Sequence, residues 1–327
     1  MAGKLPKVLI LAGGGGHTGY AWIIAEELQG KAELTFLAPD DEPIGVKRLS
    51  PFGKVRTLTK PRHPTTPTWR FLLRLAKASW QSLFLVPGDA DVAVSTGSNF
   101  CVPPALAAWV KGVPIVSLES RVKLERASGA ARFIGRFAKL NALQWDEQRR
   151  FYEKGVVFGP LLPRRLVEPH DGGYVLVTGG TYGYRELFEA AVASDLKNVV
   201  LQTGNLDPTP YAGRRANWKV ISFTDKFHEL IAGASVVVTP PGGTPVEATT
   251  YGKPVVIVPY PGWTKAADEG ETILFAEKIG AVVLEKVEPS ALVEAVKEAR
   301  NRAVKPLVNG TTVLCDAILT VARVDKT

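Results

Sequence analysis

Apolar and polar positions alternate along this chain in blocks that predict strands followed by helices. Val8–Ala12 is an unbroken apolar run typical of a buried strand, and Thr18–Leu28 has the spacing of the helix after it. The segments AELTFLAP, DVAVSTG and VPIVSLES predict further strands, and PPALAAWVKG predicts a helix that ends at Gly112. Strands that alternate with helices at this spacing indicate an α/β protein with a parallel sheet.

The same pattern begins again in the second half of the chain. GPLLPRRLVEPHDGG is rich in proline and glycine and predicts a linker, after which YVLVTGGTYGYRELFEAAV repeats the opening strand, glycine turn and helix. Further strands are predicted in NVVLQTG, KVISFT, SVVVTPPGG and KPVVIVPY. We expect two doubly wound, Rossmann-like domains, 1–160 and 161–327, with the last helix in the second domain or packed back on the first. Such sheets bind ligands at the carboxyl ends of their strands, which predicts a cleft between the domains.

The composition and net charge of the chain favour anionic binding partners. The 327 residues are 46% apolar and 22% charged, as in ordinary globular proteins. The net charge of +8 and the pI near 9.4 favour nucleic acid, anionic lipid or phosphate-bearing small molecules. Cys101 and Cys315 are too few for a disulfide scaffold. No apolar run approaches the roughly 18 residues of a spanning helix, and the N-terminus does not have the pattern of a signal peptide. We expect a cytoplasmic protein whose membrane contact is peripheral.

Several acidic residues and histidines are assigned no chemistry. Asp89 and Asp91 are spaced like a metal-binding pair, but they precede a strand and so lie at the wrong end of the sheet. His63, His170 and His228 have positions that favour surface or capping roles. The sequence therefore predicts no metal site.

A run of four glycines, Gly13–Gly16, leads directly into His17. Read literally, Gly14-x-Gly16-x-x-Gly19 is a dinucleotide fingerprint, and Asp40 lies about 20 residues on, where a ribose-binding acid belongs. An NAD(P)-dependent oxidoreductase is therefore one candidate. In either case, bare backbone N–H groups at the start of a helix form an anion site.

A second glycine corner occurs in TPPGGTPVEATTYGKP. Gly242 and Gly243 follow a predicted strand, and Thr244 is expected to cap the helix that holds Glu247. A carboxylate there can accept both hydroxyls of a ribose, while the glycine N–H groups meet phosphate. The alternative is a capped helix whose acidic first turn is favoured by the helix dipole.

Two charged segments have both a functional and a structural interpretation. Glu119, Ser120 and Arg121 follow a strand and either face the predicted cleft or form a solvated loop. In TWRFLLRLAKASWQSLFLVPG, one helix face gathers polar side chains and the other gathers apolar ones. This helix either packs its apolar side into the core or docks on anionic lipid. Its polar face comprises Arg70, Arg74, Lys77 and Gln81, and its apolar face comprises Leu72, Leu73, Ala76, Trp80, Leu83 and Phe84.

In their order along the chain, these motifs resemble the inverting GT-B-fold transferases that move N-acetylglucosamine from UDP to a polyprenyl diphosphate sugar. GGGGHTG, STGSNFCVPPALAA, ESRV with ASG, and LQWDEQRRFY with GVVFGP resemble the membrane-recruiting subunit of the eukaryotic enzyme that makes dolichyl diphosphate chitobiose. VLVTGGTYG, FTDKFHELIAGASVVVTPPGGTPVEATTYGKPVVIVPY and AEKIGA resemble its catalytic subunit and MurG. The chain is thus similar to an archaeal-type, single-chain version of the two-subunit enzyme.

The resemblance implies a role for each motif in N-glycan precursor assembly at the cytoplasmic face of the membrane. The glycine turn would approach the acceptor diphosphate, and His17 would remove the proton from the attacking sugar hydroxyl, with Glu119 as the second candidate base. The implied acceptor-binding residues are Gly14, Gly15, Gly16, Thr18, Ser98, Asn99 and Arg121. The implied membrane-binding residues are Trp69, Arg70, Arg74, Lys77, Trp80 and Phe84.

The donor would be UDP-N-acetylglucosamine, with no cofactor and no metal ion. The implied donor-binding residues are Gly180, Thr181, Phe223, Gly242, Gly243, Thr244, Glu247, Asp268 and Glu269. The family's usual glutamine-containing pair after VPY is replaced here by PGWTKAADEGETILFA, which leaves Asp268, Glu269 or Glu271 to contact the donor sugar. A soluble nucleotide-sugar epimerase with the same fold is a further candidate. A nucleic-acid-binding protein is disfavoured because no recognition motif is present.

Overall fold

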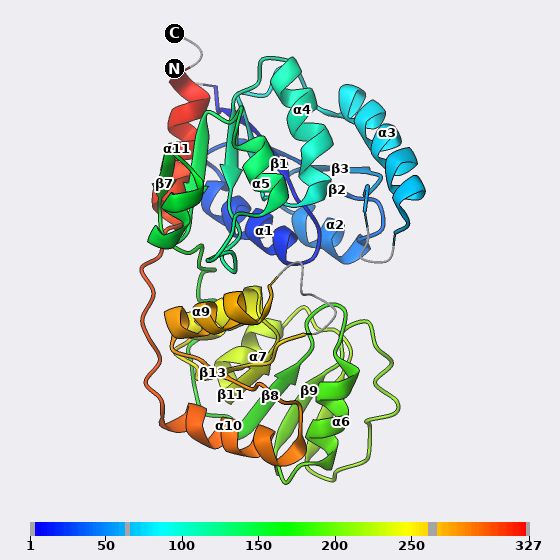
Figure 1. Ribbon diagram of the computed structural model, residues 1–327, viewed down its shortest axis with the longest axis vertical. Helices are drawn as coiled ribbons and strands as arrows, with labels where there is room; N and C mark the ends of the chain where they lie inside the picture. Colours follow the sequence, from blue (N-terminus) through cyan, green and yellow to red (C-terminus); the bar gives the residue numbers. More distant parts are fainter. Residues whose placement is uncertain (1–3, 63–65, 261–266, 325–327) are drawn as a thin grey trace. The chain divides into compact units, whose positions relative to one another are not determined.

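The computed structural model describes residues 4–62, 66–260 and 267–324 (Figure 1). The chain divides into two compact units, Met1–Leu161 with Asn309–Thr327, and Leu162–Val308. The division after Leu161 lies one residue beyond the expected end of the first domain, and the last helix belongs to the first unit. Each unit contains a parallel sheet flanked by helices, so the predicted α/β fold with two Rossmann-like domains is confirmed.

The first unit has a seven-stranded parallel sheet in its described part, with strand order β3-β2-β1-β4-β5-β6-β7. The chain begins in the middle of the sheet, moves outward to β3 and returns to place β4 beside β1. The topological switch point therefore lies between β1 and β4. The strands are β1 (Lys7–Leu11), β2 (Glu33–Pro39), β3 (Lys54–Leu58), β4 (Val92–Ser95), β5 (Ile115–Leu118), β6 (Leu140–Leu143) and β7 (Gly155–Val157).

Helices cover both faces of this sheet, and strand β1 shows why. Its side chains alternate, with Val8 and Ile10 in one apolar cluster and Leu9 and Leu11 in another. The first cluster also contains side chains of α1 and α11, and the second contains side chains of α3, α4 and α5. The helices are α1 (Gly16–Leu28), α2 (Pro43–Leu49), α3 (Thr68–Leu85), α4 (Val102–Val110), α5 (Gly129–Ile134) and α11 (Thr311–Val324), with short 3₁₀ segments η1 (Asn99–Cys101) and η2 (Asp146–Phe151).

The second unit repeats this plan with a six-stranded parallel sheet in its described part, in the order β10-β9-β8-β11-β12-β13. Its switch point lies between β8 and β11, and Val175 and Val177 of β8 pack against Leu187 and Leu292. The strands are β8 (Tyr174–Thr178), β9 (Val199–Gln202), β10 (Trp218–Ile221), β11 (Ala234–Thr239), β12 (Val255–Ile257) and β13 (Val282–Val283). The helices are α6 (Arg185–Ala193), α7 (Phe227–Gly233), α8 (Gly243–Thr250), α9 (Glu269–Ile279) and α10 (Pro289–Asn301).

The two switch points place the glycine turns. The turn after β1 and the segment after β4 meet at the carboxyl edge of the first sheet, and the turns after β8 and β11 do the same in the second. Helix α1 begins at Gly16, two residues before the predicted start, so His17 is in its first turn.

Candidate functional site

The turn after β1 lies against the segment after β4. The Gly13 N–H donates to Thr96 Oγ1 at 3.1 Å, and Ser98 Oγ donates to the Gly13 carbonyl at 3.1 Å. A Cβ at Gly13 would overlap the Ser98 hydroxyl. Glycine is therefore required here by the close approach of two segments.

The glycines that follow Gly13 differ from it in conformation and surroundings. Gly14 and Gly15 have φ values of 87° and 55°, a region that favours glycine. The ideal Cβ positions of Gly16 and Gly19 meet no atom of the described part of the chain within 4 Å. In a dinucleotide fingerprint the third glycine permits close packing of helix on strand, and the open space at Gly19 does not fit that role. The turn therefore has the geometry of an anion site but lacks the close helix–strand packing of a dinucleotide fingerprint.

The backbone directly after β4 holds the His17 ring in one orientation. Its Nδ1 lies 2.6 Å from the Thr96 carbonyl oxygen, which can only accept, so Nδ1 carries the proton. The neutral ring then presents Nε2 as a proton acceptor. Burial lowers the pKa of His17 below its ordinary 6.5, partly opposed by the Thr96 hydrogen bond, and the positive charges of Lys60 and Arg121 lower it further. His17 is therefore a neutral base at pH 7.

Arg121 is tied to Tyr20 and is only 3% exposed. The Tyr20 hydroxyl oxygen accepts from the Arg121 N–H at 2.9 Å and from Nε at 3.1 Å, and the guanidinium lies 4.4 Å from the ring centroid. The Tyr20 ring in turn meets the His17 ring edge-on, with centroids 5.8 Å apart. Tyr20 therefore contacts both Arg121 and His17.

Glu119 is buried, so the prediction of a solvated loop is wrong for this residue. The residue is 1% exposed, and its oxygens accept from the backbone N–H groups of Ser120 (2.6 Å) and Ser128 (3.0 Å) and from the Tyr152 hydroxyl. Burial raises the pKa of Glu119, while these hydrogen bonds oppose the rise. A carboxyl group with these internal partners is suited to holding a loop.

Sequence reasoning missed the side chains that build the loop of Glu119 and Arg121. Gln144 Nε2 donates to the Glu119 carbonyl at 2.8 Å, and Trp145 Nε1 donates to the Arg121 carbonyl at 2.7 Å. Gln148 Nε2 donates to the carbonyls of Ser120 and Lys123 at 2.8 and 2.9 Å. LQWDEQRRFY is therefore a scaffold for that loop. The two glutamines of this segment, beside an apolar strand, were the sequence signal that could have indicated this role.

The second unit leaves two of its glycine corners open. Gly180, with φ 67°, follows β8, and Gly242, with φ 152°, follows β11. Among the described residues, ideal Cβ positions at Gly180, Gly242 and Gly243 meet no atom within 4 Å. The Gly180 N–H donates to Thr178 Oγ1 at 3.0 Å, which fixes the first turn. The backbone of both corners can therefore be approached closely.

Two details of the second corner differ from expectation. Gly242 is the N-cap of α8 and no side chain caps the helix, so Thr244 is inside the first turn and is not the cap. The first turn contains no acidic residue, because Glu247 lies one turn further along, half-buried. The alternative of an acid in the first turn of this helix is therefore wrong.

Other predicted donor residues lie at separate places in the second unit. Phe223 follows β10 and is exposed. Asp268 is the N-cap of α9, and its Oδ1 accepts from the Glu271 N–H at 3.0 Å. Glu269 is exposed at the first position of α9, whereas Glu271 is fully buried. Most of the preceding loop, 261–266, lies outside the described residues, as does His63.

Helix α3 turns its apolar side outward, so the core-packing interpretation is wrong. Only Ala78 and Ser82 of this helix are fully buried, whereas Leu73 and Phe84 are 65% and 69% exposed. Gln81, predicted on the polar face, accepts from the Thr59 N–H at 2.9 Å. The exposed apolar side chains are Trp69, Leu72, Leu73, Trp80, Leu83 and Phe84, which we call the α3 apolar face.

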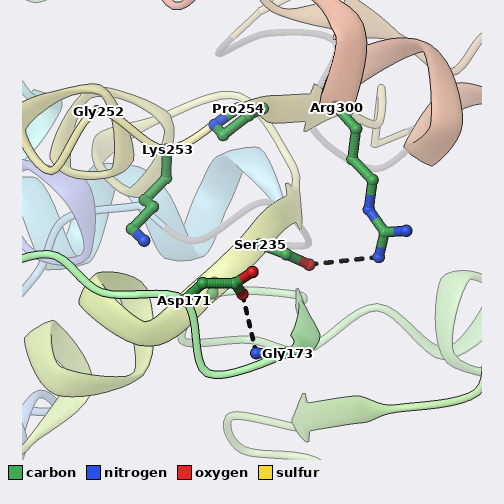
Figure 2. A pocket seen from close by; sticks show the side chains of 8 residues that line it. Asp171, Gly173, Ser235, Gly252, Lys253, Pro254 and Arg300 are labelled. Carbon is green, nitrogen blue, oxygen red and sulfur yellow. Dashed lines mark hydrogen bonds between the residues drawn. The ribbon is translucent and has the colours of Figure 1, made fainter.

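A pocket of about 540 Å³ lies at the opposite edge of the second sheet (Figure 2). Gly173, Ala234 and Pro254 mark the amino ends of β8, β11 and β12, and Arg300 donates to Ser235 Oγ at 3.3 Å. None of the predicted donor residues lines it. Among the residues that the structure describes, no three His, Cys, Asp or Glu side chains gather as a metal site, and no helix is long and apolar enough to cross a bilayer.

The chain is similar to known proteins in both sequence and fold. Residues 174–312 match the glycosyltransferase family 28 C-terminal domain. The chain is 27% identical over 333 residues to the UDP-N-acetylglucosamine--N-acetylmuramyl-(pentapeptide) pyrophosphoryl-undecaprenol N-acetylglucosamine transferase of Salinibacter ruber, which covers 90% of this chain and 88% of the relative.

Solved structures agree on the fold. MurG of Acinetobacter baumannii superposes with a TM-score of 0.63 at 18% identity, covering 97% of this chain and 99% of that one. A UDP-GlcNAc 2-epimerase of Neisseria meningitidis gives 0.67 at 14% identity, covering 96% and 100%. Transferases and epimerases thus share this fold. The solved structures therefore show the GT-B fold, and residues 174–312 are similar to the glycosyltransferase family 28 C-terminal domain.

Proposed function

We propose that this protein is an inverting glycosyltransferase that moves N-acetylglucosamine from UDP-N-acetylglucosamine to a lipid diphosphate-linked sugar. The observation that carries the proposal is the state of His17. The Thr96 carbonyl holds the proton on Nδ1, so Nε2 is free of a proton beside a glycine turn suited to anions.

The chemistry needs one base and a stabilised leaving group. The acceptor hydroxyl attacks the anomeric carbon from the face opposite UDP, its proton moves to His17 Nε2, and the bond from the anomeric carbon to the UDP oxygen breaks. Helix N-termini stabilise the departing negative charge. The proposal assigns the uridine ribose to Glu247 and the donor phosphates to the open corners at Gly180 and Gly242.

The acceptor is the finer part of the proposal. We assign a polyprenyl, dolichyl-type diphosphate N-acetylglucosamine of N-glycan precursor assembly, on the resemblance of GGGGHTG, ESRV and LQWDEQRRFY to the eukaryotic recruiting subunit. The curated relative instead acts on N-acetylmuramyl-(pentapeptide) pyrophosphoryl-undecaprenol. The reaction would occur at the cytoplasmic face of the membrane, where the α3 apolar face meets lipid.

Product analysis tests the proposal as a whole. Purified protein is incubated with a panel of UDP-sugars and, separately, with a synthetic prenyl diphosphate N-acetylglucosamine and an N-acetylmuramyl-pentapeptide lipid diphosphate. We expect mass spectrometry to find one added N-acetylhexosamine on the first acceptor only. Addition to the second acceptor alone would assign the reaction of the curated relative, and epimerised UDP-sugar without transfer would assign the epimerase.

The role of His17 predicts a defined pH–rate profile. The neutral ring is the active form and its pKa is lowered below 6.5, so the acidic limb of the kcat/KM profile should have its midpoint below pH 6.5. His17→Ala should lower turnover by roughly 10² to 10⁴ and abolish this acidic limb. UDP affinity should not change. Rescue by His17→Gln, with the limb retained, would show that His17 only donates a hydrogen bond.

The role of Glu247 predicts a loss of donor affinity. A hydrogen bond to a charged group contributes roughly 1.5–3 kcal/mol, so Glu247→Ala should weaken UDP binding by about tenfold or more. Calorimetric titration of UDP measures this effect, and thermal unfolding checks that the variant is folded. Glu294→Ala, at an exposed position of α10, serves as a matched control. Equal UDP affinity in Glu247→Ala and wild type would remove Glu247 from the donor site.

The α3 apolar face predicts binding to anionic vesicles. Each Lys or Arg near such a surface contributes about 1 kcal/mol, and Arg70 and Lys77 are exposed beside the apolar side chains. Leu73→Asp with Phe84→Asp, and separately Arg70→Glu with Lys77→Glu, should each release the protein in vesicle sedimentation without lowering Tm. Lys219→Glu with Lys286→Glu makes the same charge change at exposed sites of the second unit and should still bind. Full retention of both α3 variants would place the contact elsewhere.

A further inference from the structure

The glycine turn after β1 already contacts an anion that belongs to the chain itself. The Gly15 N–H donates to Glu42 Oε2 at 2.7 Å, and a Cβ at Gly14 would overlap Glu42 Oε1. Glu42 comes directly before α2 and 27 residues after Gly15. The carboxylate therefore occupies the position where backbone N–H groups at a helix start bind phosphate.

A lysine completes this arrangement. Lys60 Nζ lies 2.8 Å from Glu42 Oε1, and both side chains are mostly buried. Lys60 follows β3, so it reaches the turn from the same carboxyl edge of the sheet. Its charge also acts on His17, whose pKa Lys60 lowers and Glu42 raises. The pair is therefore close to the proposed base.

The same spot holds a hydroxyl whose hydrogen-bonding capacity is unused. Thr18 is 6% exposed, and within the described residues its Oγ1 has no hydrogen-bond partner. The ideal Cβ position of Gly45 lies 3.4 Å from Thr18 Oγ1 and 3.8 Å from Glu42 Oε2, so the hydroxyl and the carboxylate both lie beside Gly45. A buried hydroxyl without a partner is costly, and a phosphate oxygen is a suitable acceptor for it.

We propose that Glu42 is an internal stand-in for the acceptor diphosphate, which displaces it and takes over Lys60, the Gly15 N–H and the Thr18 hydroxyl. This inference rests on the proposed function, because it assigns the diphosphate of that acceptor to this turn. Lys60 is then a binding residue that Glu42 holds in place when no diphosphate is bound. Glu42 competes with the ligand, so the two members of one ion pair have opposite effects on binding.

Calorimetric titration of inorganic pyrophosphate into the full chain tests this inference without turnover. Lys60→Met should weaken pyrophosphate by about tenfold or more. Glu42→Gln should strengthen it by about threefold or more, because the neutral amide competes less well for Lys60. The KM for the lipid diphosphate acceptor should shift in the same two directions, with UDP affinity unchanged. Lys54→Met and Glu33→Gln, exposed residues on the same sheet, are the matched controls and should have no effect.

The sign of the two effects decides the outcome. If both variants weaken pyrophosphate binding and lower Tm together, Glu42 and Lys60 form only a structural ion pair and the inference is overturned. No change in either variant also overturns it. If Glu42→Gln does not fold, Glu42→Asp keeps the charge, withdraws it from Gly15 and should still strengthen binding. Opposite signs in a protein that transfers no sugar would support the exchange while rejecting the proposed function.

Discussion

The close approach of the turn after β1 to the end of β4 is the constraint on which the site depends. Gly13 has no Cβ, so its backbone can exchange hydrogen bonds with Thr96 and Ser98. Any side chain there would push the two segments apart and remove the Thr96 carbonyl from His17 Nδ1. The glycine thus determines the tautomer of a histidine four residues later, because that carbonyl decides which ring nitrogen carries the proton.

A second series of contacts connects the loop after β5 to His17. The loop after β5 has no regular secondary structure, so its buried carbonyls need side-chain donors. Gln144, Trp145 and Gln148 supply them, and the loop in turn places Arg121 against Tyr20, whose ring meets His17. Glu119, a candidate base by sequence, belongs to this framework through its bond from Tyr152. The buried Glu119 carboxyl group stabilises this loop, which contacts His17 through Arg121 and Tyr20.

Local signals predicted the fold, and long-range contacts limited what they could say about the site. Apolar runs and glycine corners recur within a few residues, so the parallel sheets and both glycine turns were predictable. Tyr152, which donates to Glu119, lies 33 residues away in sequence, and Glu42, which accepts from Gly15, lies 27 residues away, so no local pattern indicates either partner. Helix α3 shows the same limit. Its amphipathic spacing fits a core helix or a surface one, and the outcome depends on Ala78 and Ser82 being the buried face.

The charges around His17 suit a base that works beside a diphosphate. Lys60 and Arg121 lower its pKa, and Glu42 raises it. In the proposed exchange, a diphosphate replaces the single negative charge of Glu42 with a larger one at the same turn. More negative charge near a histidine favours its protonated form and so raises its pKa. Before binding, the ring is neutral and ready to accept a proton; after binding, its affinity for that proton is higher. Acceptor binding would then strengthen the base at the moment the hydroxyl arrives, which couples recognition of the diphosphate to the chemical step.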